Sequence, residues 1–202
     1  MSVKIFILLA MSLLSSLFFC KPSIKSAYPA IKESSGYVDT FRAKYQKDLG
    51  GGVLKKYEFD NYAGMLNDFK TVEGKIFRKL IFGDSINSFI GYARQDEEGL
   101  KFLDSLSNDL KDEKTLLFFN KKNSEQWKID IGDDYFWRKI VTFRGIERQN
   151  GSDIYIYDFD PDGNYSGTYL LNKIRYSKET GFVSLGFSSH WSNVIAYKIH
   201  RK

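Results

Sequence analysis

The chain is poor in cysteine and histidine, and these two scarcities exclude several kinds of site. It has one cysteine, Cys20, among 202 residues, so no disulfide framework holds it together. Its two histidines, His190 and His200, supply too few ligands for a zinc centre unless carboxylates dominate it. A serine hydrolase would need one of these histidines as its base, and no G-x-S-x-G elbow surrounds any serine.

Long runs of one charge and internal repeats are also missing. The formal net charge is +5, but acidic and basic residues are interleaved, and the basic clusters are short, as in Lys55-Lys56 and Lys121-Lys122. A nucleic-acid-binding arm needs a longer basic run, so we expect no nucleic-acid partner. The dispersed charge favours a solvated surface, with at most a mild attraction to anionic surfaces. No period of 20–50 residues repeats, which excludes a solenoid.

Aromatic residues, in contrast, are abundant and favour a folded, sheet-rich domain. They make up 16% of the chain, beside 43% hydrophobic and 27% charged residues. That balance is ordinary for a globular protein, and a chain of 202 residues suits one domain rather than two. Half-buried strands use aromatic and β-branched side chains, so the composition favours β structure.

The first twenty residues, MSVKIFILLAMSLLSSLFFC, have the layout of an export signal. Lys4 gives a short positive start, and residues 5–19 form an uncharged apolar run. A membrane-spanning helix needs about 20 apolar residues. This run is shorter, which favours a signal peptide over a permanent membrane helix. The small residues of an A-x-A cleavage site are missing near its end, where Cys20 stands instead.

The residues around Cys20 resemble the lipobox of bacterial lipoproteins. In that family an aliphatic residue stands three positions before an obligatory cysteine, and Leu17 and Cys20 match these two positions. Phe18 and Phe19 are bulkier than the small residues usual there and are similar to the relaxed lipoboxes of spirochaetes. The resemblance implies that the Cys20 thiol takes a diacylglycerol, that a peptidase cuts before Cys20 and that the new amino group is often acylated. It covers only these 20 residues and implies nothing about the rest of the chain.

An acylated Cys20 determines where the protein is expected to reside. Two or more acyl chains make a stable membrane anchor, whereas one gives only reversible binding. We therefore expect an exported lipoprotein anchored in the bacterial cell envelope, in the outer membrane rather than the inner one. Ordinary secretion and an uncleaved signal anchor are the alternatives.

The residues after Cys20 divide into a tether and a domain. Residues 21–36 carry two of the three prolines and several serines, which is typical of a flexible tether. The expected organisation is a signal peptide over 1–19, the acylated cysteine and tether over 20–36, and a single β-rich globular domain over 37–202.

Helical periodicity appears in the first half of this domain. Apolar residues at four-residue spacing over 41–49 predict a short helix that ends at the three glycines 50–52. These glycines lack the following G-K-[ST] of a phosphate-binding loop. A further helical turn or two is expected over 62–70. The clearest helical pattern covers 95–111, with acidic residues in its first turn and leucines along one face.

Strand patterns lie between these predicted helices and dominate after residue 114. Apolar stretches at 75–82 and 86–94 flank a hairpin signal at Gly83-Asp84-Ser85. Asn150-Gly151 is the strongest hairpin signal, because both residues tolerate positive φ. From residue 114 onward, seven short apolar runs are separated by turn sequences: 115–120, 126–131, 135–146, 153–159, 166–176, 181–188 and 193–201. The predicted fold class is α+β, mainly antiparallel β, with a C-terminal β-meander that forms a barrel or a sandwich and one or two helices packed on it.

An aspartate-rich segment, DFDPDGNYSGTY, is the sharpest candidate for a metal site. Asp158, Asp160 and Asp162, followed by glycine, reproduce the first half of a calcium loop, in which oxygen ligands at alternate positions wrap the ion. The second half departs from that loop, because its twelfth position is Tyr169 instead of glutamate. A type I turn over 161–163 explains the same residues without a metal and is favoured here. Ca²⁺ is thus the one cofactor the sequence suggests.

Two aromatic pairs are candidates for a binding surface. In Phe136-Trp137 and in His190-Trp191, one neighbour must face away from the core if the segment is a strand. Aromatic side chains at a sheet end or barrel mouth can form a pocket for a small apolar ligand or a patch for a protein.

These patterns together predict a non-enzymatic binding or interaction module, which takes a protein partner or a small apolar ligand. An envelope hydrolase is the first alternative, and it requires two turn carboxylates to converge across the sheet. The candidates for such a pair are Asp133, Asp134, Glu147 and Glu179. A calcium-dependent, adhesin-like module is the second alternative.

Overall fold

The computed structural model describes residues 37–83, 89–130, 138–162, 170–188 and 193–199 of the chain. This part consists of twelve strands and one turn of 3₁₀ helix, η1 (Leu110–Asp112). The strands of the first half are β1 (Tyr37–Asp48), β2 (Leu54–Val72), β3 (Lys75–Gly83), β4 (Phe89–Gln95), β5 (Gly99–Asp104) and β6 (Lys114–Phe118). Those of the second half are β7 (Gln126–Ile129), β8 (Lys139–Gln149), β9 (Ser152–Pro161), β10 (Leu170–Ser177), β11 (Gly181–Ser188) and β12 (Asn193–Lys198).

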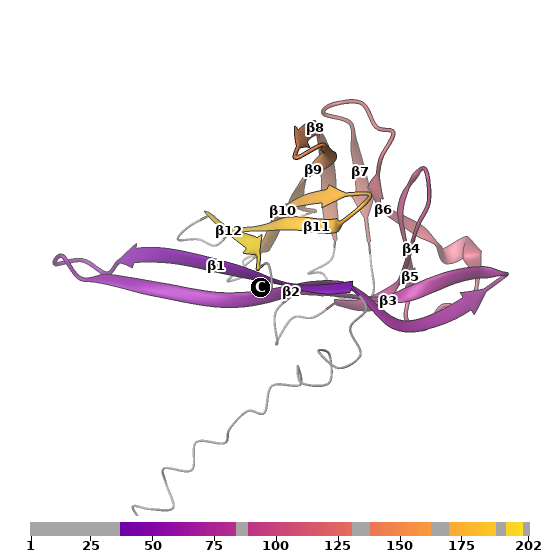
Figure 1. The fold of residues 1–202 in the computed structure, drawn as a ribbon, viewed down its shortest axis with the longest axis horizontal. Coiled ribbons are helices and arrows are strands. Elements are labelled where there is room, and N and C mark those ends of the chain that lie inside the picture. Colours follow the sequence, from indigo (N-terminus) through magenta and orange to yellow (C-terminus); the bar gives the residue numbers. More distant parts are fainter. Residues whose placement is uncertain (1–36, 84–88, 131–137, 163–169, 189–192, 200–202) are drawn as a thin grey trace, which may run out of the picture.

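All twelve strands form one antiparallel sheet with the order β6-β5-β4-β3-β2-β1-β12-β11-β10-β9-β8-β7. Each half of the chain is therefore a meander, and the two meanders join where β1 pairs with β12, at Phe41↔Lys198 and Arg42↔Tyr197. The sheet curls until its two end strands, β6 and β7, come together, so that it forms a nearly closed barrel (Figure 1).

Side chains close the seam between β6 and β7. The Tyr157 hydroxyl on β9 donates a hydrogen bond to the Phe118 carbonyl on β6 at 2.8 Å. The Phe118 ring meets the Trp127 ring of β7 edge-on, with their centroids 5.1 Å apart. The Lys114 ammonium also donates to the Asp130 carbonyl across the gap. Aromatic packing thus continues the barrel wall where the ladder of backbone pairs ends.

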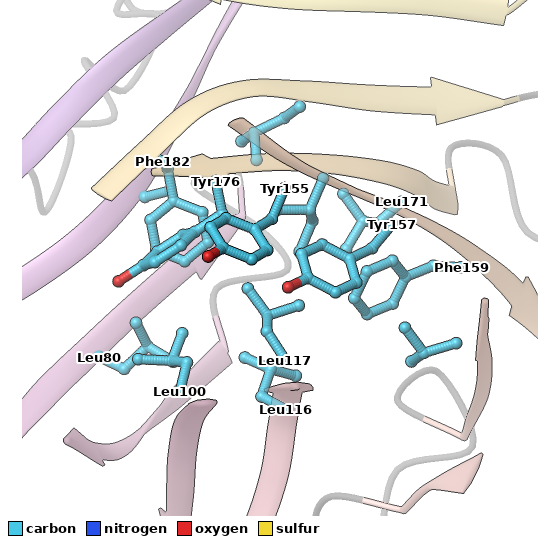
Figure 2. Packing of buried hydrophobic residues seen from close by; sticks show 14 of the residues in the cluster. Leu80, Leu100, Leu116, Leu117, Tyr155, Tyr157, Phe159, Leu171, Tyr176 and Phe182 are labelled. Carbon is cyan, nitrogen blue, oxygen red and sulfur yellow. The ribbon is translucent and has the colours of Figure 1, made fainter. Parts of the chain in front are cut away.

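Aromatic and aliphatic side chains fill the barrel interior (Figure 2). Tyr157 and Tyr176 are fully buried, and the Tyr176 hydroxyl donates to the Gln95 side-chain carbonyl at 2.7 Å. Burial raises the pKa of both phenols far above the ordinary value, so both stay neutral. Each of these two buried hydroxyls has a hydrogen-bond partner, which offsets the cost of removing it from water.

The meander predicted for the second half is confirmed. At the β8–β9 turn, Asn150 and Gly151 have φ of 51° and 86°, and Gln149 pairs with Ser152 across them. This is the geometry that a two-residue hairpin turn requires. The meander also extends through the first half, and the choice left open between barrel and sandwich is resolved as a barrel. β3 and β4 pair antiparallel, as the signal after residue 82 predicts, whereas residues 84–88 lie outside the described residues.

The helices predicted in the first half are wrong. Residues 41–49 lie mostly in β1 and residues 62–70 lie in β2, which pair with each other over the whole of β1. A four-residue spacing is two periods of a strand as well as about one turn of a helix, so the apolar pattern over 41–49 fits both. The glycines 50–52 do not end a helix; all three have positive φ and form the turn between β1 and β2.

The predicted helix over 95–111 contains β5 and η1 instead. Its acidic residues close turns: the Asp96 carboxylate accepts from the backbone N–H groups of Glu98 and Gly99, and Asp104 accepts from that of Leu106. Aspartate competes with the helix by making such local bonds. Leu100 and Leu103 are both buried although they point to opposite faces of β5, because this strand is covered on both sides.

Candidate functional site

The structure places only some of the site residues predicted from the sequence. Cys20, the pair Phe136-Trp137 and the pair His190-Trp191 lie outside the described residues. Asp158, Asp160 and Asp162 lie on β9 and just after it. Among the carboxylates considered for acid–base chemistry, Glu147 and Glu179 are described, and Asp133 and Asp134 are not.

The three aspartates lie among cations of the neighbouring strands. Asp158 is directly opposite Lys173 of β10, and its carboxylate lies 3.4 Å from the Lys173 ammonium and 2.6 Å from Arg144 Nε. The Asp162 carboxylate lies 3.1 Å from the Lys128 ammonium. Within the described residues, no group of three or more His, Cys, Asp or Glu side chains gathers closely enough to hold a metal ion. Two of the three predicted calcium ligands are thus already engaged by positive side chains.

Millimolar calcium is therefore expected to leave the melting temperature of the protein unchanged. An ion bound only by the native state would raise the melting temperature. At a calcium concentration a hundred times the dissociation constant, it would add about 2.7 kcal/mol to the free energy of unfolding. Here a Ca²⁺ ion would have to displace Arg144 and Lys173 from Asp158. Differential scanning fluorimetry with calcium, magnesium and a chelator measures the shift. A calcium-specific rise that disappears in Asp158→Asn would instead establish the calcium site.

The two remaining candidate carboxylates have partners of their own. Glu147 forms an ion pair with Arg175, and the Ser177 hydroxyl donates to Glu179 at 2.5 Å. The hydrogen bond from Ser177 lowers the pKa of Glu179 below its ordinary value. A carboxyl with a lowered pKa is ionised at neutral pH and is poorly suited to act as a general acid.

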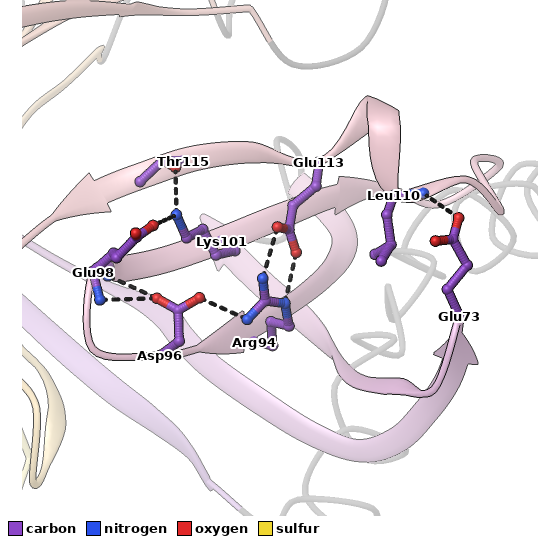
Figure 3. A network of polar contacts seen from close by, with 9 residues as sticks. Glu73, Arg94, Asp96, Glu98, Lys101, Leu110, Glu113 and Thr115 are labelled. Carbon is purple, nitrogen blue, oxygen red and sulfur yellow. Dashed lines mark hydrogen bonds and ion pairs between the residues drawn. The ribbon is translucent and has the colours of Figure 1, made fainter.

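The densest polar cluster joins β4 to the residue before β6 (Figure 3). Arg94 forms two hydrogen bonds with the Glu113 carboxylate, at 2.6 and 2.7 Å, and a third with Asp96 at 2.7 Å. The hydrogen bonds with Glu113 raise the pKa of Arg94. Burial pushes the pKa of Asp96 upward, but hydrogen bonds from Arg94 and from the Gly99 backbone outweigh it, so the pKa lies below the ordinary value. Both carboxylates are hydrogen-bonded to the one guanidinium, so we interpret this cluster as a structural clamp.

A two-stranded ribbon projects beyond the barrel wall. Residues 43–48 of β1 and 54–59 of β2 form six pairs, from Ala43↔Phe59 to Asp48↔Leu54. Within the described residues, β12 pairs with β1 only at Phe41 and Arg42, and β3 pairs with β2 only from Tyr62 onward. Residues 43–59, called the ribbon below, therefore extend about 20 Å on their own. Figure 1 shows this hairpin as the longest projection from the sheet.

One face of the ribbon continues the barrel core outward as a row of aromatic rings. At its root, Phe59 packs edge-on against Phe187 of β11, with their centroids 6.3 Å apart. Tyr45 and Tyr57 stack on each other one step further out, 4.9 Å apart. The Lys55 ammonium lies 5.2 Å from the centre of the Tyr57 ring. This ring ladder keeps the ribbon ordered, although only Ala43, Tyr45 and Phe59 of the ribbon reach the core.

The opposite face of the ribbon carries matched charges. Arg42 forms a two-point hydrogen bond with Asp60, at 2.8 and 3.0 Å, and also lies 3.0 Å from Glu58. Lys44 pairs with the second oxygen of Glu58 at 3.3 Å. The basic residues near the root are thus neutralised by acidic residues across the strand pair.

The ribbon tip, residues 49–54, presents aliphatic side chains on an ordered turn. Leu49, Val53 and Leu54 are 52%, 57% and 59% exposed. The Leu49 N–H donates to the Val53 carbonyl at 2.9 Å, and the Val53 N–H donates to Gly50 at 3.2 Å. The Asp48 carboxylate accepts from the Gly50 N–H at 2.8 Å. The apolar residues are therefore held outward by a hydrogen-bonded loop.

Sequence reasoning missed this tip, although a signal for it is present. In KDLGGGVLKK, the glycines follow a run in which residues alternate, and a second alternating run follows them. Glycines between two alternating runs also indicate a hairpin turn.

No family model, curated protein or solved structure matches the chain.

Proposed function

We propose that the protein is a lipid-anchored, non-enzymatic binding protein of the bacterial cell envelope, which contacts its partner through the β1–β2 ribbon. Leu17 and Cys20, at the end of an apolar run of signal-peptide length, support the anchor. Among the described residues, no helix is long and apolar enough to cross a membrane.

The observation that carries the binding role is the exposed aliphatic tip on the ribbon. A two-stranded hairpin is at best marginally stable by itself, and this one packs on the core only through Ala43, Tyr45 and Phe59. The outer part contributes little to the barrel and instead exposes Leu49, Val53 and Leu54, three aliphatic residues around one turn. Apolar side chains gathered at one exposed place mark sites of interaction. A ribbon of this kind suits contact with a partner better than catalysis.

The anchor is tested by the mass of the mature N-terminal peptide, purified from the membrane fraction of the native cells. We expect a peptide that begins at Cys20 and carries the mass of two or three acyl chains, because one chain would not hold the protein stably. Cys20→Ser is the matched control and is expected to give no acylated N-terminal peptide. An unmodified N-terminus beyond residue 20, or an intact Met1, contradicts the proposal.

A further inference from the structure

We propose that the ribbon tip docks into a negatively charged lipid surface and gives the protein a second membrane contact besides the acylated cysteine. The inference rests on the proposed function, since it names the partner of the ribbon. Its basis is the order in which apolar, basic and aromatic side chains follow one another from the tip to the root.

Three layers of side chains follow one another along the ribbon. Leu49 and Val53 lie opposite each other at the tip, Lys47 and Lys55 form the next pair on the same face, and Tyr45 and Tyr57 the third. Successive pairs are two residues apart along each strand, which is about 7 Å.

A bilayer has the same layers at similar depths. Its headgroup region is roughly 6 Å thick on each side of the hydrocarbon core. Surface-bound elements bury their apolar residues about 5–10 Å deep. A lysine whose backbone lies at the edge of the hydrocarbon core extends its ammonium to the headgroup phosphates, and tyrosine rings favour the interface between membrane and water. An upright ribbon would thus put its aliphatic, basic and aromatic layers at the matching depths.

The charge of the ribbon is also arranged for an anionic surface. Residues 47–56 contain Lys47, Lys55 and Lys56 against Asp48 alone, which gives a net charge of +2. The Asp48 carboxylate is turned towards the Gly50 N–H inside the turn. Near the root, Arg42 and Lys44 lie beside Glu58 and Asp60. Counted along the sequence, the net positive charge of the ribbon therefore lies at its outer end, next to the apolar side chains, where lipid headgroups would lie.

The length of chain before β1 allows both contacts to reach one membrane. Residues 20–36, the tether expected from the sequence, can span roughly 55 Å when extended. β1 has 12 residues and measures about 40 Å from its first residue to the turn. The tether is thus long enough for Cys20 to lie in the same bilayer as the tip. Because the anchor keeps the tip at high local concentration, a weak tip–lipid affinity is sufficient for docking.

The test places a fluorescent label at the tip and asks whether lipid quenches it. The full chain carries Cys20→Ser, so that the only cysteine is the one introduced by Leu54→Cys, which receives an environment-sensitive dye. Residues 5–19 then hold the chain on the vesicle in place of acyl chains. Vesicles contain phosphatidylcholine with or without phosphatidylglycerol, together with lipids brominated along the acyl chain. The matched control puts the dye at Leu106→Cys, a leucine that is 89% exposed in the turn after β5.

We expect a blue shift and quenching of the dye at position 54 in anionic vesicles, and neither at position 106. The triple change Lys47→Gln, Lys55→Gln and Lys56→Gln is expected to weaken docking on the order of 100-fold, since each lysine near such a surface contributes about fivefold. Lys111→Gln, another exposed lysine, is expected to change nothing.

Three results would overturn the inference: no quenching at position 54, equal quenching at positions 54 and 106, or equal quenching in neutral and anionic vesicles. If a crosslinker at position 54 captures a protein in cells while vesicles leave the dye unquenched, the partner is a protein and the lipid assignment is wrong. Acylation does not enter this test, so an unmodified Cys20 would refute the anchor and leave the tip result standing.

Discussion

Replacing Arg94 with methionine is expected to lower the free energy of unfolding by about 3 kcal/mol, because two carboxylates lose the cation between them. The Arg94 and Glu113 side chains are only 16% and 14% exposed, so water screens this pair poorly. The guanidinium also lies 5.6 Å from the centre of the Phe77 ring, a contact that methionine only partly replaces. Urea unfolding followed by circular dichroism measures the change.

The matched control is Arg144→Met. Arg144 lies at the same 2.6 Å from its carboxylate partner as Arg94, but it is 47% exposed. Exposed ion pairs contribute about 0–1 kcal/mol, so the control should lose no more than that. Equal losses at the two sites would contradict the interpretation of the Arg94 cluster as a clamp.

Acid is expected to reduce the difference in the free energy of unfolding between the wild type and Arg94→Met. The pKa of Asp96 lies below its ordinary 3.8 in the folded protein. Its stabilising effect is therefore present above about pH 4 and is lost as the pH falls through the folded value. In the variant, Asp96 lacks the hydrogen bond from Arg94 and takes up its proton at a higher pH. Urea unfolding is measured at intervals between pH 7 and pH 3. The free energies of unfolding of the two proteins, plotted against pH, are expected to converge as the pH falls.

The second large effect is expected for Gly99→Ala, which should cost about 3 kcal/mol of stability. A Cβ atom at Gly99 would lie 2.2 Å from the Leu117 carbonyl oxygen of β6, closer than any real contact. The clash is with backbone, so the two strands have to move apart. β6 is the strand at the seam, and its displacement would also disturb the bond from Tyr157 to Phe118.

Gly74→Ala separates this clash from the ordinary effect of losing a glycine. Gly74 has a φ of +78°, and a Cβ atom there would meet nothing within 4 Å. We expect a loss of about 1 kcal/mol from backbone strain alone. Urea unfolding followed by tryptophan fluorescence, to which Trp127 at the seam contributes, compares the two variants. If Gly99→Ala loses no more stability than Gly74→Ala, β6 moves aside without a loss of free energy and the predicted clash is wrong.

The second half of the fold could be predicted because its signals are local. Asn150 and Gly151 form their turn from their own backbone preferences, and the flanking residues alternate with the period of a strand. Apart from the pairing of β3 with β4, the first half could not be predicted in the same way. The spacing of Phe41, Tyr45 and Leu49 is shared by a helix and a strand, and the acidic residues at Asp96 suit a helix start as well as a turn.

The candidate site depended even more on contacts distant in sequence. The alternation of Asp158, Asp160 and Asp162 is compatible with a calcium loop as long as their neighbours are unknown. The sheet register then places Lys173 opposite Asp158 and brings Arg144 to the same carboxylate. These partners are 15 and 14 positions away along the chain, and no local pattern contains that information.

The sequence by itself therefore determined the strand-rich character of the protein, the meander of its second half and the expectation of an anchor at Cys20. Each of these depends on composition, on period or on a short motif. Only the tertiary structure decided that residues 41–49 and 62–70 also lie in the sheet, that β6 and β7 come together in a nearly closed barrel and that β1 and β2 extend past it as a ribbon. The physical reason is that strand pairing is non-local. A strand is stable only with its neighbours, and which residues lie beyond the last neighbour depends on the register of the whole sheet.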